Sequence, residues 1–514
     1  MLYLFLFFAS LYSFFSIGHY GGDGYEEYLT AESIVLDRDF QLHDRPHDPD
    51  QLNYKSGVGI EGRNGGTYSA RSCLGVTFPL SLFYALGHIA ASFLKNVPHD
   101  FITILFVSFY NPFISAVTVL FVFAISGHLG FKPVTSLILS LIYGLSTMAP
   151  VYTRTGFAEP TLVLFLLISV YWIIRYSKNL EERCLIYSAL ALAYCVLTKA
   201  IGFIFFPCLL VYIFWCIYAK KQNLFDRLKP VAIFAIVFIF SNFLVLSYNH
   251  IIYGSILSFG KDNPVTIATS VAQSTHFVKG VYYYLISPGK GVILFNLPII
   301  LSFVALAKIP KERRKEVVLF LLIFIVNLLF FVKSFKRGSL FSWGPRYLLP
   351  SIPFLVLLIG YYYEGYKNLT GRIFVWLLSV VGFLVMFPCM FINQSKFYLF
   401  VVEKLNLDEY LINFIPDLSP IMGAWWMFVS RIIQNITGKD ILFVFAPDYW
   451  LINKVSVSMG EYNYIDLWFV KVMEASPSFA PAVYAVLTCL ALLSIVSFYK
   501  VCVLISSKEN IEQY

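Results

Sequence analysis

Acidic side chains gather directly behind the first apolar stretch of the chain, in the run Gly21-Gly22-Asp23-Gly24-Tyr25-Glu26-Glu27-Tyr28. Helical spacing would place Asp23, Glu26 or Glu27, and Thr30 on one face. A partly desolvated carboxylate at the end of an apolar segment suits a general base that takes a proton from a hydroxyl group. Asp23 followed three residues later by Glu26 also matches a capping box at a helix start. The two interpretations are compatible, and both stay open here.

A second polar run extends from Glu61 to Arg71 and contains three glycines. Glycine favours a flexible turn, which can bring Glu61, Arg63 and Arg71 to the same place. We interpret Glu61 as an assisting acid, and Arg63, Tyr68 and Arg71 as contacts to an acceptor or within the loop. A solvated polar loop is the simpler alternative.

Two isolated cations follow at the ends of apolar segments. Arg154 stands in Thr153-Arg154-Thr155-Gly156-Phe157-Ala158-Glu159-Pro160, where an ion pair with Glu159 would explain it without any function. Lys199 separates two apolar runs, and snorkelling of its ammonium toward water explains it as well as a function does. Each cation is also a candidate ligand for an anionic group.

The run from Lys333 to Tyr347 holds four basic residues, the last of which is Arg346. A guanidinium offers a planar fork that fits phosphate oxygens, so Arg346 is the strongest candidate phosphate ligand. Binding of an anionic lipid headgroup is the simpler alternative. Lys290, within Ser287-Pro288-Gly289-Lys290-Gly291, is a further candidate; this run is not a P-loop, because the Walker spacing is absent.

Composition shows what kind of chain must position these groups. Of its 514 residues, 58% are hydrophobic and only 13% are charged, whereas soluble domains carry about a quarter charged residues. Apolar stretches of about 17–25 residues, the length that crosses a hydrocarbon core, recur throughout. The net charge of +8 comes from short loops and does not indicate nucleic-acid binding. The cysteines form no C-x-x-C pair, which argues against a zinc or disulfide framework.

The polar breaks predict an all-α polytopic membrane protein with about 12 transmembrane helices. The expected spans are roughly 2–19, 101–126, 134–151, 160–174, 184–198, 200–219, 230–248, 281–307, 317–332, 346–363, 372–393 and 481–499. The positive-inside rule then places both termini in the cytoplasm, with the basic cluster Lys308–Lys315. If Phe78–Leu94 crossed the membrane, the cluster Lys308–Lys315 would lie on the non-cytoplasmic side. We therefore expect Phe78–Leu94 to be a juxtamembrane or re-entrant helix.

The same breaks divide the chain into three parts. Residues 1–393 form the transmembrane region, with a long first outer loop at about 20–100 that carries juxtamembrane helices. Residues 394–480 form an outer-face segment of unassigned role, rich in Trp and Tyr. Residues 481–514 form the last transmembrane helix and a cytoplasmic tail. The apolar N-terminus lacks a basic n-region, so we expect an uncleaved first span.

Several blocks taken together resemble the GT-C superfamily of polytopic glycosyltransferases, in particular the dolichyl-phosphate-mannose protein mannosyltransferases and the aminoarabinose lipid A transferases. The resemblance covers roughly residues 1–365. The matching blocks are Gly22-Asp23-Gly24-Tyr25-Glu26-Glu27, the stretch 68–79, Tyr248-Asn249 with Tyr253-Gly254-Ser255, Ser287-Pro288-Gly289-Lys290-Gly291, and Trp343-Gly344-Pro345-Arg346-Tyr347-Leu348-Leu349-Pro350.

The resemblance implies a GT-C-like fold that transfers a monosaccharide from a polyprenyl- or dolichyl-phosphate donor to an acceptor hydroxyl, with inversion. It makes Asp23 the candidate base, with Glu26, Glu27 or Glu61 assisting. It makes Arg346 the ligand of the lipid phosphate. Arg154, Lys199 and Lys290 are lesser ligands of the same group.

The resemblance further implies a glycan, lipid or protein acceptor on the non-cytoplasmic face of a bacterial inner membrane, or of the endoplasmic reticulum in a eukaryote. No metal is required, although members of the superfamily differ in their use of a divalent metal. Protein mannosyltransferases usually carry adjacent Asp-Glu residues and a later His-Pro-Pro-like block. Here Gly24 follows Asp23, and the later block reads Arg71-Ser72-Cys73-Leu74-Gly75, which argues against a protein acceptor.

Three other classes of membrane protein compete with this interpretation. A transporter or lipid-linked-glycan flippase has a similar number of spans, but many show two repeated halves, and no such halves are visible here. A polysaccharide polymerase or ligase also uses lipid-linked donors, but lacks an acidic cluster behind the first span. A lipid-binding scaffold is the third class.

Overall fold

The computed structural model describes residues 1–19, 24–43, 59–70, 74–94, 97–218, 224–260, 277–333, 341–366, 368–408, 410–445 and 455–512. Within these residues the chain is almost entirely helical. The helices of the first half are α1 (Leu2–Phe14), α2 (Tyr25–Leu36), α4 (Leu74–Phe93), α5 (His99–Val107), α6 (Tyr110–His128), α7 (Pro133–Ser146), α8 (Ala149–Tyr152), α9 (Glu159–Asn179), α10 (Glu182–Thr198), the 3-10 helix η2 (Ala200–Phe205), α11 (Phe206–Tyr218) and α12 (Leu224–Tyr253).

The second half is more broken. It contains α14 (Phe277–Leu285), η3 (Leu294–Ile299), α15 (Ile300–Ala305), α16 (Arg314–Val332), η7 (Arg346–Ser351), α17 (Ile352–Gly365), α18 (Leu369–Met386), η8 (Phe387–Met390), α19 (Ser395–Leu399), α20 (Leu411–Phe414), α21 (Pro420–Thr437), α22 (Trp468–Ala475) and α23 (Ala480–Glu512). Short helical turns accompany these elements: η4 (Leu306–Lys308), η5 (Lys311–Arg313), η9 (Phe400–Lys404), η10 (Pro416–Leu418), η11 (Gly460–Tyr462) and η12 (Pro477–Phe479). Two short antiparallel strand pairs, β1 (Ile60–Glu61) with β2 (Thr67–Tyr68) and β3 (Phe443–Phe445) with β4 (Val455–Val457), are the named strands of the described residues.

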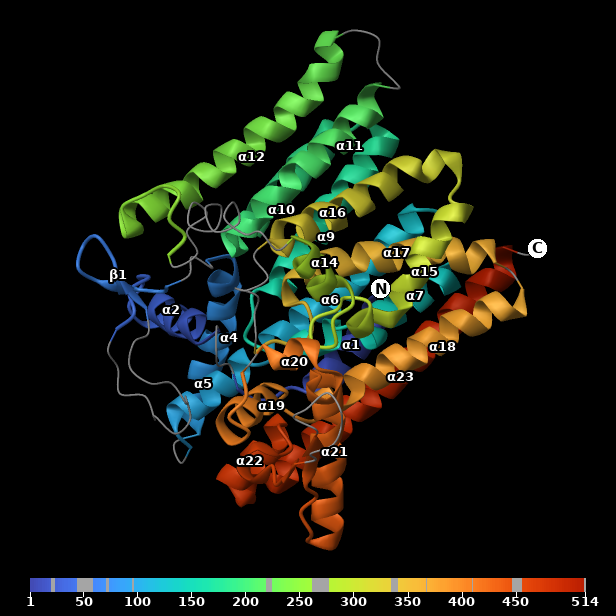
Figure 1. Cartoon of the computed structure of the whole chain (residues 1–514). Coiled ribbons are helices and arrows are strands. Elements are labelled where there is room, and N and C mark those ends of the chain that lie inside the picture. Colours follow the sequence, from blue (N-terminus) through green and yellow to red (C-terminus); the bar gives the residue numbers. More distant parts are fainter. Residues whose placement is uncertain are drawn as a thin grey trace.

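Nine helices among the described residues are long and apolar enough to cross a membrane, and three shorter apolar helices accompany them. Figure 1 shows α12, α16, α18 and α23 running in broadly similar directions. The helices therefore confirm a multi-pass, all-α membrane protein. The expected number of about twelve spans stays a prediction.

Small and hydroxylated residues hold the helices together where hydrophobic driving force is weak. The Ser169 hydroxyl of α9 donates to the backbone oxygen of Ser188 in α10 at 2.8 Å. In turn, the Ser188 hydroxyl donates to the backbone oxygen of Ser169 at 2.8 Å. Between α1 and α7, Tyr12 donates to the carbonyl of Gly144 at 2.8 Å. A Cβ on Gly144 would meet the ring of Phe8, so only glycine allows this approach.

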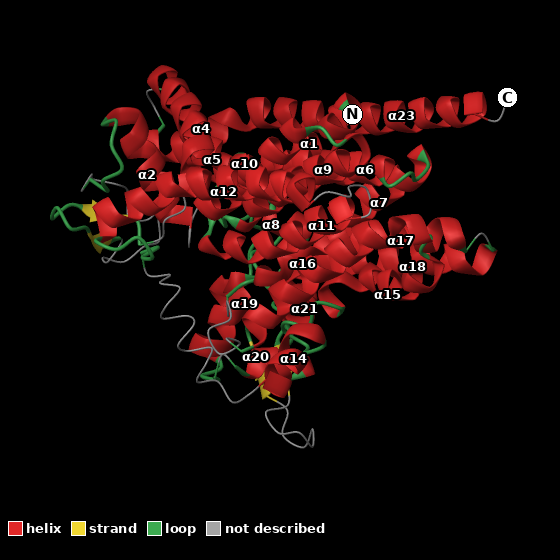
Figure 2. Cartoon of the chain, turned by 90° about the horizontal axis from the view of Figure 1, so that it is seen from above, coloured by secondary structure: helices red, strands yellow, loops and turns green. Residues whose placement is uncertain are grey.

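The apolar segment at 78–94 lies in α4, which meets the length and composition of a span. It packs against α2, α5 and α10. In Figure 2, α4 stands at a steep angle to α23. Because α4 is one of the nine helices that could cross a membrane, the juxtamembrane placement expected from charge parity stays a prediction. Beneath α2, Tyr28 shares a hydrogen bond with Thr103 at 2.8 Å, and Tyr84 donates to Glu32 at 2.9 Å.

The predicted span 281–307 is not one helix, which corrects that expectation. Helix α14 ends at Leu285, and a turn through Pro288 and Gly289 precedes η3. The turn lies against α20, because the amide of Gly289 donates to the carbonyl of Asn413 at 3.2 Å. A Cβ on Gly289 would lie 2.5 Å from the Cα of Asn413. This backbone contact fixes where the apolar segment must break.

The segment at 394–480 packs against the end of α1. The backbone amide of Trp468 donates to the carbonyl of Ser16 at 2.9 Å, and its indole donates to the carbonyl of Ser13 at 3.1 Å. Gly18 adopts φ +64°, and a Cβ there would lie 2.6 Å from the Cβ of Trp468. Figure 1 places α19 and α22 away from the C-terminus.

Candidate functional site

Three residues from distant parts of the chain form one buried ionic cluster, which we name the Glu159 cluster. The ammonium of Lys199 lies 2.7 Å from Oε1 of Glu159, and Nε of Arg346 lies 3.3 Å from the same oxygen. The exposed fractions of the three side chains are 2% for Glu159, 6% for Arg346 and 20% for Lys199. Among the described residues, the cluster therefore joins two cations to one carboxylate, with the ammonium closest to solvent.

Helix ends explain why the three side chains meet. Glu159 begins α9, where the positive end of the helix dipole favours a carboxylate. Lys199 follows the last residue of α10 in an extended conformation. Arg346 begins η7 directly after Pro345. Because α9 packs against both α10 and η7, the ends of the three helices present all three groups at one level.

Two aromatic rings cover the cations. The guanidinium of Arg346 lies 4.0 Å from the ring centre of Phe157, and the ammonium of Lys199 lies 5.0 Å from the ring centre of Tyr347. Aromatic faces stabilise cations electrostatically. The rings also limit access of water, so the charges act in a medium less polar than the open surface.

The backbone that carries Arg346 is fixed by hydrogen bonds. The carbonyl of Ser342 accepts from the ammonium of Lys290 at 2.5 Å and from the hydroxyl of Tyr398 at 3.0 Å. The carbonyl of Trp343 accepts from the hydroxyl of Tyr152 at 2.5 Å. The Trp343 side chain is fully buried. Arg346 is therefore presented by a loop with little freedom to move.

Lys290 is thus placed behind the Glu159 cluster. It is 2% exposed, and it also donates to the Ser342 hydroxyl at 3.2 Å. Burial, with a smaller contribution from the nearby Arg346, lowers the pKa of Lys290 well below its ordinary value. The Lys290 ammonium also lies 5.4 Å from the ring centre of Tyr398. Its role as a phosphate ligand stays a prediction.

Only part of the acidic run behind α1 lies among the described residues. Asp23 lies outside the described residues, while Glu26 and Glu27 lie in the first turn of α2. One oxygen of Glu26 accepts from the amide of Ala70 at 2.6 Å and from the hydroxyl of Ser69 at 3.0 Å; the other accepts from the amide of Gly59 at 3.3 Å. Glu26 therefore ties the second polar run to α2, and Glu27 is buried beside it.

The second polar run forms the β1–β2 hairpin. Glu61 and Arg63 are exposed, and Tyr68 is buried. The hydroxyl of Tyr68 accepts from the Asn64 amide at 2.7 Å. The backbone amide of Arg63 donates to the carbonyl of Ile252 at 2.8 Å, which attaches the hairpin to the end of α12. Arg71 lies outside the described residues.

Arg154 bonds backbone rather than the Glu159 carboxylate. Its guanidinium donates to the carbonyls of Phe15 at 2.7 Å and Ile392 at 3.0 Å, and to those of Cys389 and Asp466. Burial lowers its pKa to about 10, with Asp466 opposing. Arg154 therefore joins the end of α1, the end of η8 and the segment before α22.

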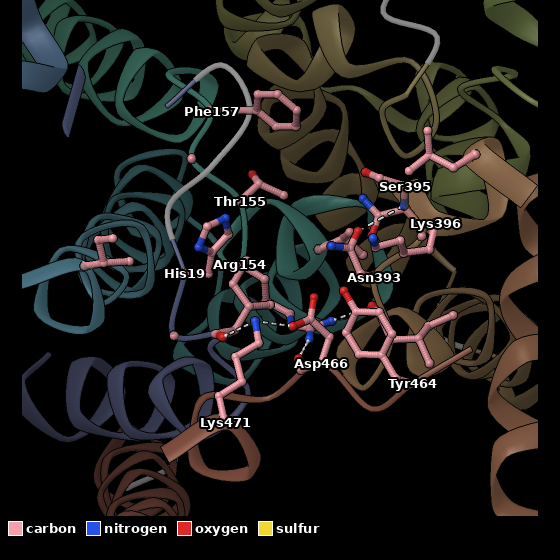
Figure 3. A pocket seen from close by; sticks show the side chains of 18 of the residues that line it. His19, Arg154, Thr155, Phe157, Asn393, Ser395, Lys396, Tyr464, Asp466 and Lys471 are labelled. Carbon is pink, nitrogen blue, oxygen red and sulfur yellow. Dashed lines mark hydrogen bonds and ion pairs between the residues drawn. The ribbon is translucent and has the colours of Figure 1, made fainter. Parts of the chain in front are cut away.

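Beside Arg154 lies a cavity of about 650 Å³ that sequence reasoning did not find. Figure 3 shows His19, Thr155, Asn393, Lys396 and Tyr464 around its opening. Its residues come from 17–19, 101–104, 151–157, 392–399 and 464–475. The one sequence feature that pointed to this cavity was His19, which lies just before the acidic run. Nothing in the sequence indicated which part of residues 394–480 would lie opposite His19.

An ion pair lies at the base of the cavity. The ammonium of Lys471 is 2.5 Å from Oδ1 of Asp466. Burial would raise the pKa of Asp466, but Lys471 and Arg154 hold it below the ordinary value. His19 lies beyond the end of α1, and burial, reinforced by Lys471, lowers its pKa to about 4. Its imidazole is therefore neutral near pH 7.

Asp37, Asp39 and His43 are the described residues whose ligand atoms gather closely enough for a metal ion, within 4.8 Å of one another. His43 bonds Asp39 at 3.1 Å, and the group is partly exposed. Such geometry is common in surface ion pairs, so we assign the group no role.

Comparison with known proteins locates one related region. The family model described as dolichyl-phosphate-mannose-protein mannosyltransferase matches residues 88–251, about a third of the chain. This range runs from the end of α4 to the end of α12 and includes Arg154, Glu159 and Lys199. The match confirms the predicted resemblance to GT-C enzymes and relates the chain to membrane glycosyltransferases that use a lipid-linked donor.

Among solved structures, the crystal structure of ArnT from Cupriavidus metallidurans bound to undecaprenyl phosphate aligns with 97% of this chain and 76% of its own. The sequence identity is 14% and the TM-score is 0.45. No curated protein matches the sequence.

Proposed function

We propose that this protein is a membrane glycosyltransferase that moves a monosaccharide from a polyprenyl- or dolichyl-phosphate donor to an acceptor hydroxyl on the non-cytoplasmic face, with inversion of the anomeric carbon. The Glu159 cluster carries the proposal. It combines two cations with one carboxylate at neighbouring helix ends. The excess positive charge suits the phosphate of a lipid-linked sugar.

The donor would bind with its phosphate against Arg346 and Lys199. A guanidinium matches two phosphate oxygens with two parallel N–H bonds, whereas an ammonium acts as a point charge. Without a bound donor, the Glu159 carboxylate contacts both cations and offsets the repulsion between them. The buried loop at 342–346 holds Arg346 in position, so little ordering is required when the phosphate arrives.

The base would come from the acidic run behind α1. Asp23 is our candidate, since it follows the cavity-lining residue His19 by four positions in the sequence. Both oxygens of Glu26 already accept hydrogen bonds, one from Ala70 in the second polar run and the other from Gly59 just before it, which favours a structural role for this residue. Glu27 and Glu61 stay assisting candidates.

The reaction would be one displacement. The acceptor oxygen loses its proton to the Asp23 carboxylate and forms a bond to the anomeric carbon. The bond from that carbon to the phosphate oxygen breaks, and the electron pair leaves with the lipid phosphate. Arg346 and Lys199 stabilise the charge that develops on the leaving phosphate. A single attack from the opposite face inverts the anomeric carbon.

Transfer of labelled sugar in proteoliposomes tests this proposal. The wild type is compared with Asp23→Asn and Arg346→Ala against a panel of polyprenyl-phosphate monosaccharides and a membrane-lipid extract as acceptor source. We expect transfer from at least one donor, and a loss of about a hundredfold or more in each variant. Near-normal transfer by Asp23→Asn would move the base to Glu27 or Glu61. Transfer that needs no lipid-phosphate donor would contradict the proposal.

A further inference from the structure

The cavity beside Arg154 is a built site that the donor scheme leaves unused. Its volume of about 650 Å³ lies in the range of small-molecule sites. One wall comes from the loop between α8 and α9, and the facing wall comes from residues 392–399 and 464–475. The second wall belongs to the segment for which the sequence offered no role.

Polar groups converge on this cavity from both walls. Lys396 enters from α19, with its ammonium 5.8 Å from the ring centre of Tyr464. Figure 3 shows Asn393 beside Lys396, and His19 and Thr155 on the opposite side. An amide, a hydroxyl and a neutral imidazole suit a ligand with several hydroxyl groups, and an aromatic ring suits the apolar face of a sugar.

The charges of the lining favour an anionic ligand. Arg154, Lys396 and Lys471 are three cations against two carboxylates, Asp466 and Glu474. Asp466 and Lys471 neutralise each other at 2.5 Å. The guanidinium of Arg154 is directed at backbone carbonyls. Lys396 is therefore the cation of the lining best placed to meet an acidic group.

We propose that this cavity binds the acceptor, and that the acceptor is a sugar bearing one acidic substituent, either a carboxylate or a phosphate, which Lys396 recognises. The assignment of this ligand as the acceptor rests on the proposed function. Phe157 connects the two sites, because it lines the cavity and its ring lies 4.0 Å from the Arg346 guanidinium. An acceptor in this cavity would thus lie next to the proposed donor phosphate.

The test is direct binding to the full chain in lipid nanodiscs, without any donor. The probes are glucuronate, glucose 6-phosphate and neutral glucose, and the readout is a saturation-transfer NMR titration that gives Kd. The variants are Lys396→Ala and Lys396→Gln, with Lys404→Ala as a matched control. Lys404 is exposed, lies eight positions further along the same segment and is outside the cavity.

We expect at least one acidic sugar to bind about tenfold more tightly than glucose, since a charge-assisted hydrogen bond contributes that much. Both Lys396 variants should lose this preference, and Lys404→Ala should keep it. Which probe binds identifies the acidic group as carboxylate or phosphate. Equal affinity for all three sugars, or an unchanged preference in a folded Lys396 variant, would overturn the proposal.

Binding and transfer separate this inference from the proposed function, because sugar binding is measured without any donor. Selective binding that depends on Lys396 in a protein that transfers no sugar would refute the proposed function and keep the ligand site. Transfer from a lipid-phosphate donor with no acidic-sugar binding would refute the cavity assignment alone.

Discussion

The Glu159 carboxylate meets the Lys199 ammonium at 2.7 Å across the ends of α9 and α10, forty positions apart in the sequence. The same carboxylate oxygen meets Arg346 at 3.3 Å. This buried acid therefore offsets the repulsion between two cations that lie side by side.

Glu159→Gln should destabilise the protein, because it removes the buried carboxylate that Arg346 and Lys199 both contact. Breaking a buried ion pair by removing one partner costs about 3–5 kcal/mol. Glu182→Gln is the matched control: its pair with Lys229 has the same 2.7 Å separation but is about half exposed, and exposed pairs contribute little. The measurement is the midpoint of thermal unfolding in detergent. Equal shifts in the two variants would show that burial of Glu159 has no energetic consequence.

Gly344→Ala should displace Arg346. Gly344 adopts φ +56°, and a Cβ there would lie 2.7 Å from the ring of Phe295. Gly438 has φ +69° with open space around it, so Gly438→Ala reports backbone strain alone, roughly 1–2 kcal/mol. We expect the Gly344 variant to lose more stability than this control and to bind lipid phosphate more weakly. Indistinguishable unfolding midpoints would argue against the Phe295 contact.

Arg154→Met should loosen the segment that closes the cavity. The guanidinium bonds carbonyls of α1, of the η8 region and of the segment before α22, and a thioether cannot replace these bonds. Hydrogen exchange should rise at residues 391–399 and 464–475 while α9 and α10 stay protected. Arg175→Met is the control, because the Arg175 guanidinium contacts a residue of its own helix: it lies 5.0 Å from the ring centre of Trp172 in α9. Unchanged hydrogen exchange in the Arg154 variant would show that other contacts hold residues 391–399 and 464–475 in place.

His19 should make stability depend on pH. Burial lowers its folded-state pKa to about 4, while an unfolded histidine titrates near 6.5. Between these values the unfolded chain binds more protons, so stability falls as pH drops from about 6.5 to about 4. His19→Gln should reduce the change of the thermal unfolding midpoint with pH over this window. Substitution of the exposed His250 by Gln should leave that pH dependence unchanged. A slope that persists in the His19 variant would place its origin in another group.

The sequence predicted the parts of this fold that depend on local pattern. Apolar length predicted most helices, including α4, whose juxtamembrane placement stays a prediction. Arg346, Lys199 and Arg154 were each selected from their positions at helix ends. The sequence paired Arg154 with Glu159, five positions away, whereas Glu159 meets Lys199 and Arg346, because side-chain direction at helix ends depends on packing.

Features that depend on contacts between distant segments could not be predicted. The break in 281–307 is fixed by the approach of Gly289 to Asn413. The cavity forms only when residues 464–475 fold back onto the end of α1 through Trp468. Neither partner carries a pattern that identifies the other, so His19, Lys396 and Asp466 stood out only in three dimensions.

The central claim is that the Glu159 cluster holds a lipid phosphate, and binding of undecaprenyl phosphate compared with uncharged undecaprenol tests it most directly. The measurement is native mass spectrometry on the wild type, Arg346→Ala and Arg372→Ala; Arg372 is an exposed arginine at the start of α18. We predict that the wild type and Arg372→Ala prefer the phosphate lipid, and that Arg346→Ala loses about tenfold or more of that preference. An unchanged preference in folded Arg346→Ala would contradict the account.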